Sequence, residues 1–73
     1  METKTPTDIL KMAILMEKRG KAFYSQVALQ TQDEEARNIF QYMAEEEQMH
    51  VEFLSKQFSY YEKNHKFDVK CTN

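Results

Sequence analysis

Apolar residues recur every three or four positions through most of the chain, which is typical of helices with one buried face. A first stripe of this kind runs through residues 6–29 and comprises Leu10, Ala13, Glu17, Gly20, Tyr24, Val27 and Ala28. A second stripe runs through residues 33–63 and comprises Ala36, Phe40, Met43, Ala44, Glu47, His50, Val51, Leu54, Phe58 and Tyr61. Since a helix turns by about 100° per residue, each set shares one face. The pattern predicts two long amphipathic helices.

Residues at the start of each stripe carry helix-start signals. Thr5 is a suitable N-cap, and Pro6 suits the first helical position. Before the second stripe, Thr31 with Glu34 fits a capping box, and Asp33 is an alternative cap. With either cap, the second helix begins within a few residues of the end of the first.

These signals predict an all-α fold in a single domain, residues 1–73. We expect one helix over about 6–29, a second over about 33–63, and a frayed tail over 64–73. Two long helices joined by a short turn lie antiparallel. The expected fold is therefore an antiparallel two-helix hairpin.

Three residues of the stripes are potential metal ligands: Glu17, Glu47 and His50. Residues equally distant from the turn lie level in an antiparallel hairpin, so a turn near residues 32–33 brings the three together, about 20 Å from the turn. Neither stripe contains a lysine or arginine, and a buried carboxylate is costly without a cation. A metal ion would supply the missing charge.

A single hairpin would leave such an ion short of ligands, whereas a two-fold partner doubles the set. Four carboxylates and two imidazoles suffice for two ions, as in di-iron carboxylate bundles with one Glu from each of two helices and a Glu-x-x-His from each of the others. We therefore predict Glu17, Glu47 and His50 as metal ligands and catalytic residues in a dimeric four-helix bundle. Two iron ions per dimer, or manganese or another divalent metal, suit these ligands better than structural zinc. Tyr24, two turns from Glu17 on its face, is a weaker candidate beside the ligands.

Composition narrows the function classes. A chain of 73 residues is marginally stable alone, and its single cysteine excludes an internal disulfide, which leaves metal binding and oligomerisation as stabilising devices. The net charge is −2, and acidic and basic residues are interspersed along the chain. We therefore expect the protein to bind neither nucleic acid nor a membrane surface. The apolar run 12–16 is too short to span a bilayer. Without a signal-peptide pattern, a cytoplasmic location is expected.

The second helix carries a further apolar stripe, offset from the first by about a third of a turn: Tyr42, Met49, Phe53 and Tyr60. Such a stripe has nothing to pack against inside one hairpin. It predicts a second interface, and therefore an assembly larger than a dimer.

Three segments carry a family resemblance: ILMEKRGKAFY at 14–24, DEEARNIF at 33–40 and AEEEQMH at 44–50. Together they resemble the rubrerythrin branch of the ferritin-like superfamily, over about residues 9–62. In that family a first-helix Glu, corresponding to Glu17, and a Glu-x-x-His, corresponding to Glu47 and His50, bind the di-iron centre. Family members usually carry two such helix pairs in one chain, whereas this chain has one. In that respect it resembles the encapsulated ferritins, whose iron site forms between subunits.

The resemblance implies ferroxidase activity, the oxidation of Fe²⁺ to Fe³⁺ for iron storage and detoxification, with an encapsulin shell as a candidate partner and a protein nanocompartment as the location. Two departures keep alternatives open. Residues 67–73 do not resemble the hydrophobic targeting peptide of encapsulated ferritins, and the chain lacks the four cysteines of the rubrerythrin iron–sulfur domain. The alternatives are a peroxide reductase with an external electron donor and a structural helical oligomerisation module without catalysis.

Overall fold

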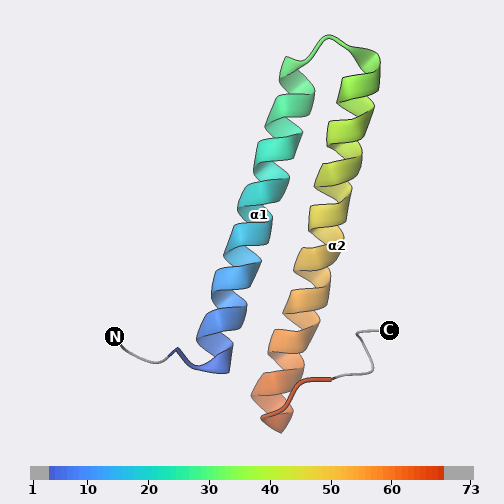
Figure 1. Ribbon diagram of the computed structural model, residues 1–73. Helices are drawn as coiled ribbons and strands as arrows, with labels where there is room; N and C mark the ends of the chain where they lie inside the picture. The colour runs from blue at the N-terminus through green and yellow to red at the C-terminus, as the bar shows by residue number, and fades with distance from the viewer. Residues whose placement is uncertain (1–3, 69–73) are drawn as a thin grey trace.

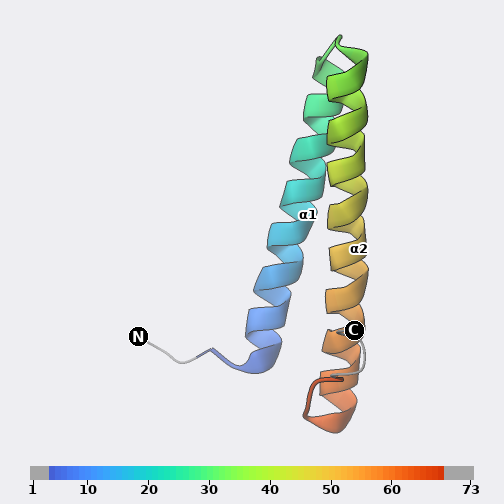
Figure 2. The ribbon, with the colours of Figure 1, turned by 45° about the vertical axis from the view of Figure 1, so that its right-hand side comes forward.

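The computed structural model describes residues 4–68 as two antiparallel helices (Figure 1). Helix α1 spans Pro6–Gln30 and helix α2 spans Glu34–Asn64, with no strand among the described residues. Figures 1 and 2 show the helices side by side, with the start of α1 and the end of α2 far from the turn. The predicted all-α hairpin is confirmed, and each helix ends one residue beyond the predicted range. Within residues 4–68 neither helix is apolar enough over a sufficient length to cross a membrane.

The start of α1 is fixed by a reciprocal pair of hydrogen bonds. The Asp8 backbone N–H donates to the Thr5 hydroxyl over 3.2 Å, and the Thr5 N–H donates to the Asp8 carboxylate over 3.3 Å. This capping box supplies partners for amide groups that have none inside the helix, and Pro6, which has no N–H, removes one donor that would need a partner.

The start of α2 decides between the two predicted caps. The Asp33 carboxylate accepts a hydrogen bond from the Glu35 N–H over 3.2 Å, so Asp33 is the N-cap. The alternative, a capping box of Thr31 and Glu34, is not formed, because Thr31 ends α1 by donating its N–H to the Val27 carbonyl over 3.1 Å. A turn of three residues is therefore enough to reverse the chain.

The core between the helices is narrow. Its buried apolar members are Leu10, Ala28, Ala44 and Val51. Close to the turn, the rings of Tyr24 and Phe40 stack with their centroids 6.5 Å apart. No large side chain among the described residues is completely buried, so the hairpin alone covers only part of its apolar surface.

The hairpin has one broad apolar face. Its members are Ile9, Met12, Met16 and Phe23 of α1, and Ile39, Tyr42, Met49 and Phe53 of α2, which are between 36% and 64% exposed. The helical period places both sets on the same side of the antiparallel pair, the side toward which His50 projects. On the opposite side the Lys21 ammonium donates to the Gln48 amide oxygen over 2.7 Å.

The tail does not fray where it is described. His65 adopts a left-handed conformation, with φ of 57°, and ends α2 by donating its N–H to the Tyr61 carbonyl over 2.7 Å. The chain then turns back along α2, and the Phe67 ring lies 5.0 Å from that of Tyr61. The expectation of a frayed tail is therefore wrong for residues 65–68, because they pack on the helix. Residues 69–73 lie outside the described part.

Candidate metal centre

The middle of the hairpin brings the three predicted ligands together. Glu17 comes from α1, and Glu47 and His50 come from successive turns of α2. One ligand atom of each lies within 4.8 Å of the other two. One of these contacts joins His50 Nδ1 and Glu17 Oε2 over 3.1 Å. Two carboxylates and one imidazole thus lie close together, as predicted from their equal distances from the turn.

Electrostatics couple the two carboxyl groups. Hydrogen bonding to Glu47, and next to His50, lowers the pKa of Glu17 below its ordinary value. The same hydrogen bond to Glu17 raises the pKa of Glu47. No lysine or arginine of residues 4–68 forms an ion pair with either carboxylate, and His50 is the basic group beside Glu17. A metal ion at this cluster would supply the positive charge that favours ionisation of both carboxyl groups.

Gly20 provides the space for one of the carboxylates. A Cβ atom built on Gly20 would lie 3.0 Å from Glu47 Oε2 and 3.2 Å from Glu47 Cδ. The Glu47 carboxylate thus occupies the volume that a side chain on Gly20 would fill. The cluster forms a cradle with carboxylate and imidazole donors, a ligand set that suits iron or manganese.

The family model of rubrerythrin matches residues 8–72, which include both helices and all three cluster residues. The chain belongs to the rubrerythrin family. Comparisons with curated proteins and with solved structures gave no match. Rubrerythrins are ferritin-like di-iron carboxylate proteins, so membership suggests iron binding, and the one acidic and histidine cluster found in residues 4–68 lies where those ligands are expected.

Tyr24 has a different environment from the one its spacing suggested. Besides stacking on Phe40, its ring meets that of Phe23 edge-on at 5.4 Å. Within the described residues it makes no hydrogen bond to Glu17, Glu47 or His50. Tyr24 therefore packs between the cluster and the turn, and a role beside the ligands stays a prediction.

Sequence reasoning missed the roles of three residues at the cluster: Gly20, Lys21 and Gln48. In the sequence Gly20 stands out only as a member of the first stripe, although a glycine on the buried face one turn from Glu17 is a usable signal. The bond between Lys21 and Gln48 joins the residues that follow Gly20 and Glu47 in sequence. Contacts of adjacent residues on both helices fix the register at the level of the cluster.

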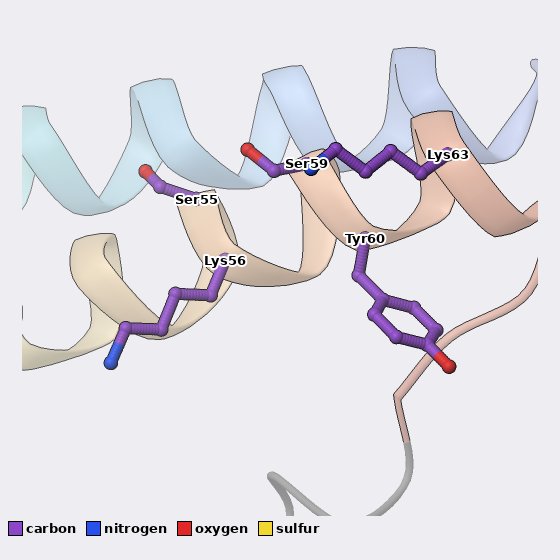
Figure 3. Close-up of a pocket in the computed structure, with 5 residues that line it drawn as sticks. All are labelled: Ser55, Lys56, Ser59, Tyr60 and Lys63. Atoms are coloured by element: carbon purple, nitrogen blue, oxygen red, sulfur yellow. The ribbon is translucent and has the colours of Figure 1, made fainter.

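A surface hollow elsewhere offers no comparable chemistry. Figure 3 shows this hollow on α2, with side chains that point in different directions. Its lining consists of Ser55, Lys56, Ser59, Tyr60 and Lys63. Because these residues include no carboxylate and no imidazole, the candidate chemistry of the described chain is concentrated at mid-hairpin.

Proposed function

We propose that two copies of this chain form a di-iron ferroxidase, in which Glu17, Glu47 and His50 of each copy bind iron. The observation that carries the proposal is the convergence of three donor side chains within 4.8 Å at the middle of the hairpin. Membership of the rubrerythrin family supports iron as the metal. The fit of the Glu47 carboxylate into the space at Gly20 supports a site shaped around these ligands.

The half-site argues for a dimer. One chain supplies two carboxylates and one imidazole, which is half of the ligand set of a di-iron carboxylate bundle. The His50 side chain is 55% exposed, whereas that of Glu17 is 29% exposed, so the cluster opens on the His50 side. A second copy related by a two-fold axis would cover His50 and bring the missing ligands.

The apolar face supplies the surface for this dimer. It surrounds His50 on both helices, and Met16 and Met49, which flank the cluster, are 64% and 60% exposed. The stripe of Tyr42, Met49, Phe53 and Tyr60 was predicted to serve a separate interface. Because it lies on the same side as the exposed residues of α1, we assign it to the dimer interface instead. A still larger homo-oligomer stays a prediction.

The reaction follows from the charge of the site. Fe²⁺ is the substrate, and each ion gives up one electron as it becomes Fe³⁺. Two such electrons, with two protons, reduce O₂ to H₂O₂ or H₂O₂ to two H₂O. Four carboxylates around two ions favour the ion of higher charge, because the attraction between opposite charges grows with their product. The role of Glu17 and Glu47 is therefore to bind Fe²⁺ and to favour its oxidised form.

Two alternatives use the same residues. A rubrerythrin-like peroxide reductase is favoured by the family match, and it would consume peroxide with an external electron donor faster than it consumes oxygen. A structural module without catalysis is favoured by the contact between His50 and Glu17, since the cluster can satisfy its own hydrogen bonds without metal. Iron content separates the structural reading from the other two.

The experiment is an anaerobic titration of the purified dimer with Fe²⁺, followed by addition of O₂ or of H₂O₂. We expect two bound iron ions per dimer and rapid appearance of Fe³⁺ absorbance. Glu47→Ala should abolish the oxidation, whereas Glu45→Ala, which removes an exposed carboxylate two residues away, should not. Equal oxidation rates in Glu47→Ala and the parent would refute the site assignment. Less than one equivalent of iron per dimer in the parent would favour the structural module.

A surrounding encapsulin shell in the cytoplasm is a further part of the proposal, based on the likeness to encapsulated ferritins. The terminal residues, where a targeting peptide would lie, fall outside the described part of the chain. Co-expression with an encapsulin followed by purification of the shell tests this part. Cargo recovered inside the shell supports it, and recovery only outside the shell contradicts it.

A further inference from the structure

We propose that Gly20 is a positioning residue for the metal site, required because its missing side chain leaves room for the Glu47 carboxylate. The contact that points to this role is specific. The three atoms nearest to a Cβ placed on Gly20 are Oε2, Cδ and Cγ of Glu47, at 3.0, 3.2 and 3.6 Å. Since all three belong to one side chain, a methyl group at this position would act on Glu47 before it acted on anything else.

The size of the effect depends on what Glu47 can do in response. Distances of 3.0–3.4 Å are tighter than most real Cβ contacts, so the carboxylate would have to move by a few tenths of an ångström. The carboxylate is the end of a flexible side chain, and such a shift costs the fold little. The same shift would change the position of a ligand atom relative to Glu17 and His50, whose atoms now lie within 4.8 Å of it.

The helices themselves cannot separate freely to relieve the contact. Next to Gly20 and Glu47, the Lys21 ammonium is bonded to the Gln48 amide oxygen over 2.7 Å. This bond links the two helices on the side of the cluster opposite to His50 and opposes their separation there. We therefore expect the carboxylate, and not the helix, to give way.

These points predict opposite effects on folding and on metal binding. Alanine has a higher helix propensity than glycine, so Gly20→Ala should leave the thermal midpoint of the metal-free protein unchanged or raise it. A displaced ligand should weaken metal binding by about 10- to 100-fold, the range found when the support of a metal ligand is lost. A residue with a merely structural role would change both quantities in the same direction.

The test uses the full chain, with Co²⁺ and Fe²⁺ titrated under anaerobic conditions. The visible spectrum of Co²⁺ reports its ligand geometry without any turnover. We expect Gly20→Ala to bind Co²⁺ more weakly and with an altered spectrum, and to remain dimeric by sedimentation. Ala22→Gly is the matched control, because it exchanges the same methyl group at an exposed position of α1. It should lower the thermal midpoint slightly and leave Co²⁺ binding unchanged.

A second variant tests whether the Glu47 carboxylate is the group that Gly20→Ala displaces. Glu47→Asp withdraws the carboxylate by one methylene, so the loss of affinity caused by Gly20→Ala should be smaller in the Glu47→Asp background. Equal losses in both backgrounds, or unchanged Co²⁺ affinity and spectrum in Gly20→Ala, would overturn the role of Gly20. Because that role depends on the proposed site, failure of the parent to bind either metal would instead refute the proposed function.

Discussion

His50 Nδ1 lies 3.1 Å from Glu17 Oε2, a contact between side chains that are 33 positions apart in the sequence. It joins the middle of α1 to the middle of α2 and turns Nδ1, rather than Nε2, toward the carboxylates. In a metal-free chain this contact is a hydrogen bond that the Glu17 carboxylate accepts from the His50 imidazole. In the proposed site the same nitrogen becomes a metal ligand.

Replacing His50 should therefore separate metal binding from folding. We expect His50→Ala to reduce bound iron to less than one ion per dimer and to slow Fe²⁺ oxidation by at least about 100-fold. The fold should persist, because the His50 side chain is 55% exposed and contributes little burial. Iron analysis and stopped-flow absorbance measure the two effects. His65→Asn is the control, since asparagine tolerates the left-handed backbone at that position. Unchanged iron content in His50→Ala would contradict the ligand assignment.

The apolar face should be needed to form the dimer that completes the proposed site. Phe23, which is 61% exposed, becomes buried in the proposed dimer. Loss of a buried aromatic ring costs about 1.5–3 kcal/mol, and introduction of a charge adds to it. Phe23→Glu should therefore raise the dissociation constant of the dimer by about tenfold or more. Sedimentation equilibrium measures this change.

Leu29→Glu is the matched control for the face. Leu29 is 83% exposed but lies away from His50, where it lines a surface hollow together with Gln41 of α2. Its substitution should leave both the dimer and Fe²⁺ oxidation intact. If Leu29→Glu dissociates the dimer and Phe23→Glu does not, the interface lies on another side of the hairpin.

The capping box gives the start of α1 a defined pH dependence. Hydrogen bonds to Thr5 hold the pKa of Asp8 below its ordinary value of 3.8. A group whose pKa is lower in the folded state stabilises it above the unfolded-state pKa, and this contribution is lost as pH falls through the folded-state value. Asp8→Asn should therefore reduce stability at pH 6 and converge with the parent as the pH falls well below 3.8.

Circular dichroism melts between pH 2.5 and 6, at about half-unit intervals, measure this convergence. Glu62→Gln removes one exposed carboxylate outside the capping box and serves as the control for net charge. A constant difference between Asp8→Asn and the parent over the whole range would show that the charge on Asp8 does not contribute.

Periodicity predicted the fold and the cluster because both depend on local rules. Glu17, Glu47 and His50 follow from helical spacing and from the level of residues about the turn. The role of Gly20 could not be predicted, because it depends on a distance of 3.0 Å between two helices. The exposed apolar residues of α1 and the further apolar stripe of α2 lie on the same side of the hairpin. Antiparallel packing accounts for this, but the pattern of either helix alone does not show it.

The end of α2 shows the same limit. Gln57 lies outside the predicted stripe, and a glutamine there indicates a solvated position. In the structure it is only 4% exposed, because residues that follow the helix fold back over it. Local pattern cannot reveal a burial that a later segment produces.

Gln57 should accordingly be a stability residue. Its Nε2 donates to the Asp68 carbonyl over 2.8 Å, and its Oε1 accepts from the Asp68 N–H over 3.0 Å. Gln57→Ala removes both bonds and leaves part-buried backbone groups without these partners, which costs about 1–3 kcal/mol. Urea unfolding at a fixed dimer concentration measures the loss, and faster hydrogen exchange at the Asp68 amide locates it.

The control and a second substitution sharpen the test. Gln41→Ala, at an exposed position on α2, should change stability by less than about 0.5 kcal/mol. Gln57→Glu keeps an acceptor for the Asp68 N–H but, when ionised, faces the Asp68 carbonyl with a second acceptor instead of a donor. It should therefore be less stable than the parent near neutral pH and recover as the new carboxyl is protonated. Equal stability of the parent and Gln57→Ala would show that the return of the chain over α2 contributes nothing to the fold.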